Sequence, residues 1–230
     1  MAESNGRFSG VRALIFDLDG TLIDSQLDLV LSVNATLAHL GRAQHTHADI
    51  CTFIGNGAPA LVRRALGEGA SEQEVQRGLS YFLSYYRIHM LDNTVAYPGV
   101  REALEQLAQR DKYSMAVLTN KPVHFSRAIV EGLGLARFFR FVYGGNSFET
   151  KKPDPLGAQT LLRELQTAPP AAMMVGDSDV DIKTARNAGM SACGVTYGFG
   201  AEGLRAYPPD LLLENLRDLP AHLADNTASS

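Results

Sequence analysis

The sequence has few cysteines, no excess of positive charge and no long apolar run. Its two cysteines, Cys51 and Cys193, lie far apart and in no Cys-x-x-Cys motif, so we expect reduced thiols and no disulfide framework. A formal net charge of -4, without a block of Lys or Arg, argues against a nucleic-acid or anionic-membrane surface. No apolar run approaches the length of a transmembrane helix. We therefore expect a small-molecule partner, with no nucleic acid and no membrane.

The two ends of the chain are polar. The start, Met1 to Gly10, lacks the basic residues and the apolar run of a secretory signal, so we expect a cytoplasmic protein. The end, Asp225 to Ser230, is predicted to be disordered. The 230 residues, of which 45% are hydrophobic, suffice for one large domain or for a domain with an insertion. The sequence does not predict an oligomeric state.

The most informative stretch places two carboxylates, Asp17 and Asp19, at the end of an apolar run. Val11 to Phe16 predicts a short buried strand, and Gly20 turns the backbone after it. The acids would then lie at the carboxyl edge of a strand, where open α/β sheets bind their ligands. Taken alone, the pair is equally typical of aspartates that cap a loop.

From Pro98 onward, predicted strands alternate with predicted helices. This order indicates an α/β fold with a doubly wound parallel sheet. The predicted strands are 114–119, 141–143, 172–175, 191–195 and 211–213, and the predicted helices are 100–110, 123–132, 154–165 and 182–187.

The segment between the first strand and this region is predicted to be entirely helical. Apolar residues at helical spacing predict helices at 24–40, 58–66 and 71–90, and Ser71 with Glu74 forms a Ser-x-x-Glu capping box. We therefore expect an α-helical cap of residues 23–92, inserted into a catalytic core of residues 1–22 and 93–230.

Polar residues follow four of the predicted strands. In a parallel sheet these strand ends are neighbours in space, and together they predict a phosphate site. Mg²⁺ prefers carboxylate oxygens together with a substrate phosphate, so Asp17 and Asp177 are the expected pair of metal-binding acids. The four groups are Asp17 with Asp19, Thr119 with Asn120, Lys152, whose neighbour Lys151 is expected to be a bystander, and Gly176 to Asp181.

These residues resemble the four motifs of the haloacid dehalogenase-like phosphatases, in order and over nearly the whole chain. The resemblance implies a Rossmann-like core with an α-helical cap. It implies that Asp17 attacks phosphorus and becomes an aspartyl phosphate, while Asp19 protonates the leaving oxygen and later deprotonates water. The motifs are Asp17-Leu18-Asp19-Gly20-Thr21, Leu118-Thr119-Asn120, Lys152-Pro153-Asp154-Pro155 and Gly176-Asp177-Ser178-Asp179-Val180-Asp181.

Electrostatics accounts for this division of labour. An acid beside Mg²⁺ stays ionised, whereas repulsion between like charges can keep a second acid, Asp19, protonated. A hydroxyl group, backbone N–H groups and the Lys152 ammonium would neutralise the transferring phosphoryl group. The expected catalytic residues are Asp17, Asp19, Thr119 and Lys152, the expected metal residues are Asp17, Asp19 and Asp177, and the expected supporting residues are Ser178 and Asp181.

The predicted cap is expected to select the substrate. Gly55, Asn56 and Gly57 open a helix that carries Arg64, and this segment is similar to the phosphoglycolate phosphatases within the family. Free N–H groups at a helix start and a guanidinium both suit an anion, so Gly55, Asn56 and Arg64, with Asn120 of the core, are the expected substrate-binding residues.

The resulting hypothesis is a Mg²⁺-dependent phosphatase of a small phosphorylated metabolite, with 2-phosphoglycolate favoured. The alternatives with the same chemistry are an inorganic pyrophosphatase or a sugar-phosphate phosphatase. A mutase is disfavoured because the cap offers no convincing acid/base, and a dehalogenase because Asp19 is present. A receiver domain of a signalling system would be shorter and without a helical insertion, and a catalytically silent relative would lack motif residues.

Overall fold

The computed structural model describes residues 8–224, and its core is a six-stranded sheet of order β5-β4-β1-β6-β7-β8. Every neighbouring pair in that sheet is parallel. The predicted doubly wound α/β fold is therefore confirmed. Most of the polar start (residues 1–7) and the predicted disordered tail (residues 225–230) lie outside the described residues.

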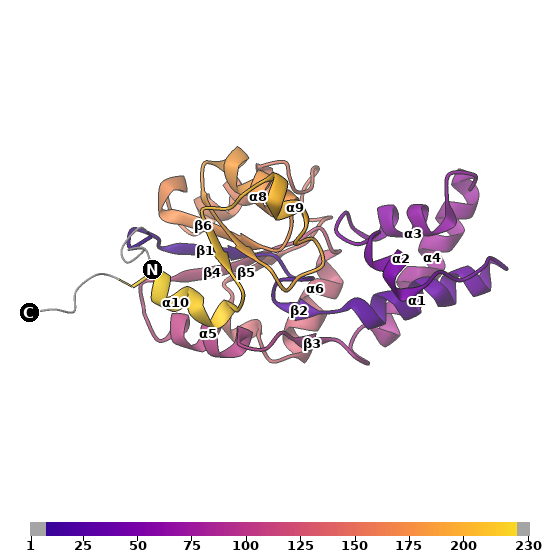
Figure 1. Ribbon diagram of the computed structural model, residues 1–230, viewed down its shortest axis with the longest axis horizontal. Coiled ribbons are helices and arrows are strands. Elements are labelled where there is room, and N and C mark those ends of the chain that lie inside the picture. The colour runs from indigo at the N-terminus through magenta and orange to yellow at the C-terminus, as the bar shows by residue number, and fades with distance from the viewer. Residues whose placement is uncertain (1–7, 225–230) are drawn as a thin grey trace, which may run out of the picture.

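The strands and helices of the core follow the predicted order (Figure 1). The strands are β1 (Ala13–Phe16), β4 (Ser114–Leu118), β5 (Phe141–Tyr143), β6 (Ala172–Gly176), β7 (Ser191–Val195) and β8 (Leu211–Leu213). The helices are α5 (Val100–Ala108), α6 (Val123–Gly132), α7 (Leu156–Glu164), α8 (Asp179–Ala188), α9 (Gly203–Ala206) and α10 (Leu219–His222), with 3₁₀ helices at Ala136–Phe138, Pro169–Ala171 and Leu216–Asp218.

The central strand β1 contributes to two apolar layers. Its alternate residues Ala13 and Ile15 pack in a cluster with residues of α7 and α8, whereas Leu14 and Phe16 pack in a cluster with residues of α5 and α6. This alternation is the consequence of the two-residue repeat of a strand. Helices therefore cover both faces of the sheet, which leaves its carboxyl edge open for the site (Figure 1).

Four helices form a separate group beside the sheet in Figure 1: α1 (Gln26–His39), α2 (His47–Cys51), α3 (Ala58–Leu66) and α4 (Glu72–His89). The two chain segments that lead to them pair as antiparallel strands, β2 (Ile23–Asp24) and β3 (Val95–Ala96). The expectation that 23–92 is entirely helical is thus wrong at its first two residues. We propose this strand pair as the boundary between core and cap.

Three local details differ from the expectations. Helix α2 was missed because it spans only five residues of a polar stretch, although Thr46 and Asp49 form a capping box at its start. Helix α8 begins at Asp179, because Ser178 caps it. The capping box at Ser71 is half formed: the Ser71 side chain accepts from the Glu74 N–H, whereas the Glu74 carboxylate binds Arg42.

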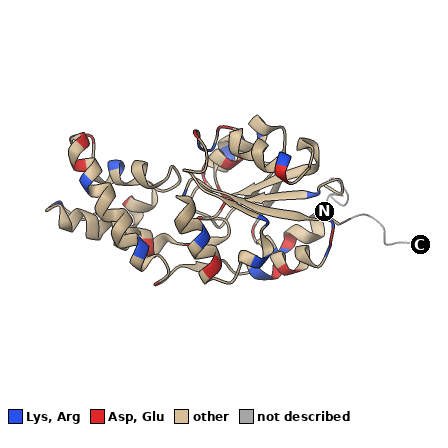
Figure 2. Ribbon diagram, turned by 180° about the vertical axis from the view of Figure 1, so that it is seen from behind, with Lys and Arg blue, Asp and Glu red and all other residues tan. Residues whose placement is uncertain are grey.

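Charged residues lie outside the central sheet. The six strands of the sheet carry none, and Figure 2 shows positive and negative residues interspersed on the ribbon around them. No helix within residues 8–224 has the length and apolar character needed to cross a membrane.

Candidate active site

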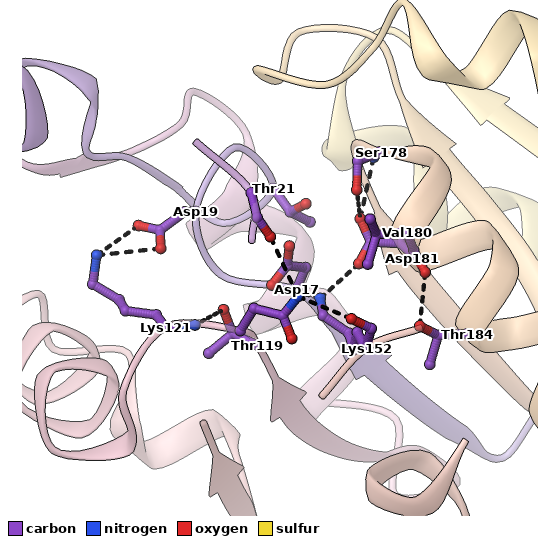
Figure 3. Close-up of polar contacts among 12 residues, drawn as sticks. Asp17, Asp19, Thr21, Thr119, Lys121, Lys152, Ser178, Val180, Asp181 and Thr184 are labelled. Atoms are coloured by element: carbon purple, nitrogen blue, oxygen red, sulfur yellow. Dashed lines mark hydrogen bonds and ion pairs between the residues drawn. The ribbon is translucent and has the colours of Figure 1, made fainter. Parts of the chain in front are cut away.

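Asp17 directly follows β1, so the central strand delivers its carboxylate to the carboxyl edge of the sheet. The Lys152 ammonium lies 2.8 Å from Asp17 Oδ1 and 2.6 Å from Asp181 Oδ1 (Figure 3). Burial alone would lower the pKa of Lys152, but these two carboxylates more than offset it and raise that pKa. The buried ammonium is therefore held in its charged form.

Three carboxylates form a cluster: one oxygen each of Asp17, Asp177 and Asp181 lies within 4.8 Å of the others. Asp177 accepts hydrogen bonds from the Thr21 hydroxyl (3.3 Å) and the Gly200 N–H (2.9 Å). Burial raises the pKa of Asp177 and of Asp17 well above the usual carboxyl range, although Lys152 opposes the effect at Asp17. Buried acids this close are stable as ions only with a compensating positive charge.

Glycine is required next to this cluster. Gly20 has a φ of 82°, a backbone conformation that disfavours a side chain, and a Cβ there would overlap the Asp177 carboxylate. The turn after Asp19 can therefore approach Asp177 only because residue 20 has no side chain.

The side chain of Asp19 turns away from the cluster. Its carboxylate lies 2.9 and 3.2 Å from the Lys121 ammonium and accepts a hydrogen bond from the Ser25 hydroxyl (2.5 Å). Asp19 was expected among the metal residues, but its carboxylate is not part of the cluster, because these two partners hold it toward the cap. Besides the charge of Asp17, Asp19 therefore has an ammonium group as a direct neighbour, which was not predicted.

Thr119 and Asn120 follow β4 and are both buried. The Thr119 hydroxyl oxygen accepts from the Lys121 N–H (3.2 Å), which leaves its proton for another acceptor. The Asn120 amide group donates to the carbonyl oxygens of Lys152 (3.1 Å) and Gly55 (3.3 Å). Asn120 therefore joins the loop that carries Lys152 to the loop that opens α3.

Ser178 and Asp181 act through Lys152. The Ser178 hydroxyl and N–H donate to Asp181 Oδ2 at 2.7 and 3.1 Å, which directs Asp181 Oδ1 to the Lys152 ammonium. A Cβ on Gly176 would overlap Asp181, so the end of β6 also needs a glycine. This arrangement fits the supporting role expected for Ser178 and Asp181.

A cavity of about 190 Å³ lies between the strand ends and the cap. Of the expected substrate-binding residues, Gly55 and Asn120 line it, whereas Asn56 and Arg64 do not. The Arg64 guanidinium donates to the Phe53 carbonyl (2.9 Å) and to Asn56 Oδ1 (2.6 Å). These bonds hold the Arg64 guanidinium on the loop that precedes α3, outside the lining of the cavity.

Two residues that line the cavity, Lys121 and Tyr86, were not among the expected site residues. The Lys121 ammonium lies 2.7 Å from the Tyr86 hydroxyl, and both side chains are buried. Lys121 directly follows Thr119 and Asn120 after the end of β4, and this position could have identified it as a site residue. Tyr86 belongs to a run of aromatic residues on α4 that resembled ordinary cap packing.

Comparisons with known proteins agree with this geometry. The family model described as haloacid dehalogenase-like hydrolase matches residues 14–195. A phosphoglycolate phosphatase of Pseudomonas syringae pv. tomato is 37% identical over an alignment of 227 residues, and the match covers 95% of this chain and 83% of that protein. Phosphoglycolate phosphatase 1 of Pseudomonas aeruginosa is 38% identical over an alignment of 215 residues, and the match covers 90% of this chain and 78% of that protein.

Solved structures give the same result. The crystal structure of a protein from Haemophilus somnus, described as a predicted phosphoglycolate phosphatase, has a TM-score of 0.86 and 32% identity, covering 91% of this chain and 96% of that one. A protein from Lactobacillus delbrueckii, described as a putative phosphoglycolate phosphatase, has a TM-score of 0.85 and 29% identity, covering 92% and 98%. The chain therefore belongs to the haloacid dehalogenase-like hydrolase family and is a phosphoric monoester hydrolase.

Proposed function

We propose that this chain is a Mg²⁺-dependent phosphatase that hydrolyses 2-phosphoglycolate to glycolate and phosphate through an aspartyl phosphate on Asp17. The observation that carries the proposal is the division of the site into two parts. Asp17 belongs to the acid cluster with Lys152, whereas Asp19 faces the cavity from the cap side with Lys121. A nucleophile and a proton donor with separate partners suit a two-step transfer. The relatives named phosphoglycolate phosphatase support the substrate.

The donor set of the acid cluster fits Mg²⁺. It consists of carboxylate oxygens only, from Asp17, Asp177 and Asp181, and such oxygens are the ligands this ion prefers. Asp17 and Asp177 would hold the ion, and Asp181, which is already paired with Lys152, would support it. When bound, the ion would neutralise negative charge on the phosphoryl oxygens.

In the first step, a carboxylate oxygen of Asp17 attacks phosphorus and the bond from phosphorus to the substrate's bridging oxygen breaks. Asp19 gives its proton to that oxygen, so the alcohol leaves neutral. Lys152 and the Thr119 hydroxyl donate to the phosphoryl oxygens and hold them in line with Asp17. Loss of one such donor lowers the rate by on the order of 10²-fold.

In the second step, Asp19 takes a proton from a water molecule, whose oxygen attacks phosphorus. The bond between phosphorus and the Asp17 oxygen breaks, and phosphate leaves. Asp19 is then protonated again and ready for the next substrate. The Ser25 hydroxyl and Lys121 hold the Asp19 carboxylate toward the cavity in both steps.

The apolar lining of the cap side supports a small substrate. It includes Leu29, Ile54, Leu61 and Phe82, side chains that offer no hydrogen bonds to the hydroxyl groups of a sugar, and Phe125 of α6 adjoins them. We propose that the enzyme acts in the cytoplasm on a small phosphorylated metabolite.

The test is phosphate release with Mg²⁺ from 2-phosphoglycolate, inorganic pyrophosphate, several sugar phosphates and an aryl phosphate, beside the Asp17→Asn variant. A preference for 2-phosphoglycolate that requires Asp17 supports the proposal. Comparable rates on all substrates would remove the named substrate, and turnover by Asp17→Asn would remove the mechanism.

A further inference from the structure

The cavity is lined by two cations among residues 8–224, Lys121 and Lys152. Lys152 is bonded to two members of the acid cluster, Asp17 and Asp181. Lys121 lies apart from that cluster, beside Asp19 (Figure 3). The two ammonium groups are thus placed to meet different parts of a bound substrate: Lys152 the phosphoryl group and Lys121 the leaving group.

The surroundings of Lys121 are otherwise apolar. Its ammonium lies 4.6 Å from the centre of the Tyr86 ring, and that ring is packed on Phe82 and Phe125. The Lys121 side chain is only 5% exposed. An anionic group entering this part of the cavity would have a strong partner, because water competes little there.

Lys121 and Tyr86 have donors to offer such a group. The Lys121 ammonium has three N–H groups. It lies 2.7 Å from the Tyr86 hydroxyl and 2.9 Å from Asp19 Oδ1. Its contact with Asp19 Oδ2 is the longest, at 3.2 Å. Burial raises the pKa of Tyr86 to about 12, so its hydroxyl keeps its proton. Within residues 8–224 that hydroxyl accepts from Lys121 and has no acceptor for its own proton.

The distance to the reacting atoms is right for a carboxylate. Asp19 must form a hydrogen bond of about 2.7 Å with the bridging oxygen of the substrate. Because Lys121 Nζ is 2.9 Å from Asp19 Oδ1, the ammonium then lies within roughly 6 Å of that oxygen. In 2-phosphoglycolate the carboxylate carbon is two bonds from the same oxygen.

We propose that Lys121 and Tyr86 form the subsite that binds the substrate's carboxylate. The substrate carboxylate replaces Asp19 Oδ2 as the acceptor of one Lys121 N–H and accepts a hydrogen bond from the Tyr86 hydroxyl. The hydrogen bond from Lys121 to Asp19 Oδ1 is kept. This inference rests on the proposed function. Because Tyr86 lies on α4 and Lys121 follows β4, the subsite needs both the cap and the core.

The experiment compares two substrates of nearly equal size: 2-phosphoglycolate, and 2-hydroxyethyl phosphate, in which a hydroxymethyl group replaces the carboxylate. The ratio of their kcat/KM values is measured for the wild type, Lys121→Met, Lys121→Arg, Tyr86→Phe and Lys151→Met. The last variant loses the same charge from an exposed lysine that does not line the cavity. Thermal unfolding checks that each variant is folded.

We expect the ratio to fall about 10- to 100-fold in Lys121→Met, chiefly through KM, because a hydrogen bond to a charged group is lost. It should fall a few-fold in Tyr86→Phe, recover partly in Lys121→Arg, and stay unchanged in Lys151→Met. If Lys121→Met does not fold, Tyr86→Phe decides the question.

Equal losses on both substrates in Lys121→Met and no change of ratio in Tyr86→Phe would overturn the subsite and leave the proposed function standing, since Lys121 would then only orient Asp19. A wild type without preference for 2-phosphoglycolate would overturn both.

Discussion

Tyr86 of the cap accepts a 2.7 Å hydrogen bond from Lys121 of the core. The same ammonium pairs with Asp19, so the cap is bonded to the partner of the proton donor. Asn120 makes a second connection, through the Gly55 carbonyl. The cap is therefore part of the wall of the site, and its residues are expected to affect which leaving group is accepted more than how phosphorus is attacked.

Replacing the nucleophile should abolish turnover. We expect Asp17→Asn to lower kcat by at least about 10³-fold, because an amide cannot form the covalent intermediate. The measurement is phosphate release, together with intact-mass detection of phosphorylated protein after rapid quenching. Asp179→Asn is the control from the first turn of α8: its carboxylate pairs with Lys183 outside the cavity, and it should keep wild-type activity. Phosphorylated protein from Asp17→Asn would contradict the assignment.

Removing Lys152 should destabilise the fold as well as stop catalysis. Lys152→Met leaves Asp17 and Asp181 buried without their cation, and breaking a buried pair in this way lowers the free energy of unfolding by about 3–5 kcal/mol. Lys183→Met removes a partly exposed pair with Asp179 and should lower the free energy of unfolding far less, because solvent screens that pair. Denaturant unfolding of both variants at neutral pH measures the difference. Equal effects would show that the buried pairs add no more stability than the exposed one.

Stability without metal should fall as pH rises. Burial raises the pKa of Asp17 and Asp177, so the folded chain retains protons that the unfolded chain has already released. The stabilisation is complete below the usual carboxyl pKa and is lost as pH rises through the raised values. Mg²⁺ binds the ionised carboxylates, so it should raise the melting temperature more at about pH 8 than at about pH 5. An equal rise at both values would contradict the involvement of these acids.

Arg64 should influence the cavity through its loop. Arg64→Met removes the hydrogen bonds to the Phe53 carbonyl and to Asn56. The loop at Gly55 should then be less ordered. We therefore expect KM to rise a few-fold both for substrates with a carboxylate and for substrates without one. Arg63→Met, which breaks only the exposed pair with Glu72, is the matched control. A loss confined to 2-phosphoglycolate would restore Arg64 as the partner of the carboxylate, as the sequence first suggested.

Much of the fold was predictable because it depends on local patterns. Short apolar runs marked the strands, and helices were predicted near the observed positions Ala58–Leu66 and Val123–Gly132. The elements that were missed, such as α2 and the strand Ile23–Asp24, are short and depend on pairing or capping with other segments. A pattern within a few residues carries little information about such partners.

The sequence by itself determined the chemistry of this protein: which acids follow which strands, and that four strand ends meet at one edge of a parallel sheet. Only the tertiary structure decided which cation faces which acid. Lys121 and Asp19 are 102 positions apart, and Lys121 and Tyr86 are 35 apart. Arg64 and Lys121 both suited an anion by residue type, but the packing of the cap on the core brings Lys121 to the cavity and holds Arg64 on its own loop. Side-chain direction depends on that packing, which no local pattern encodes.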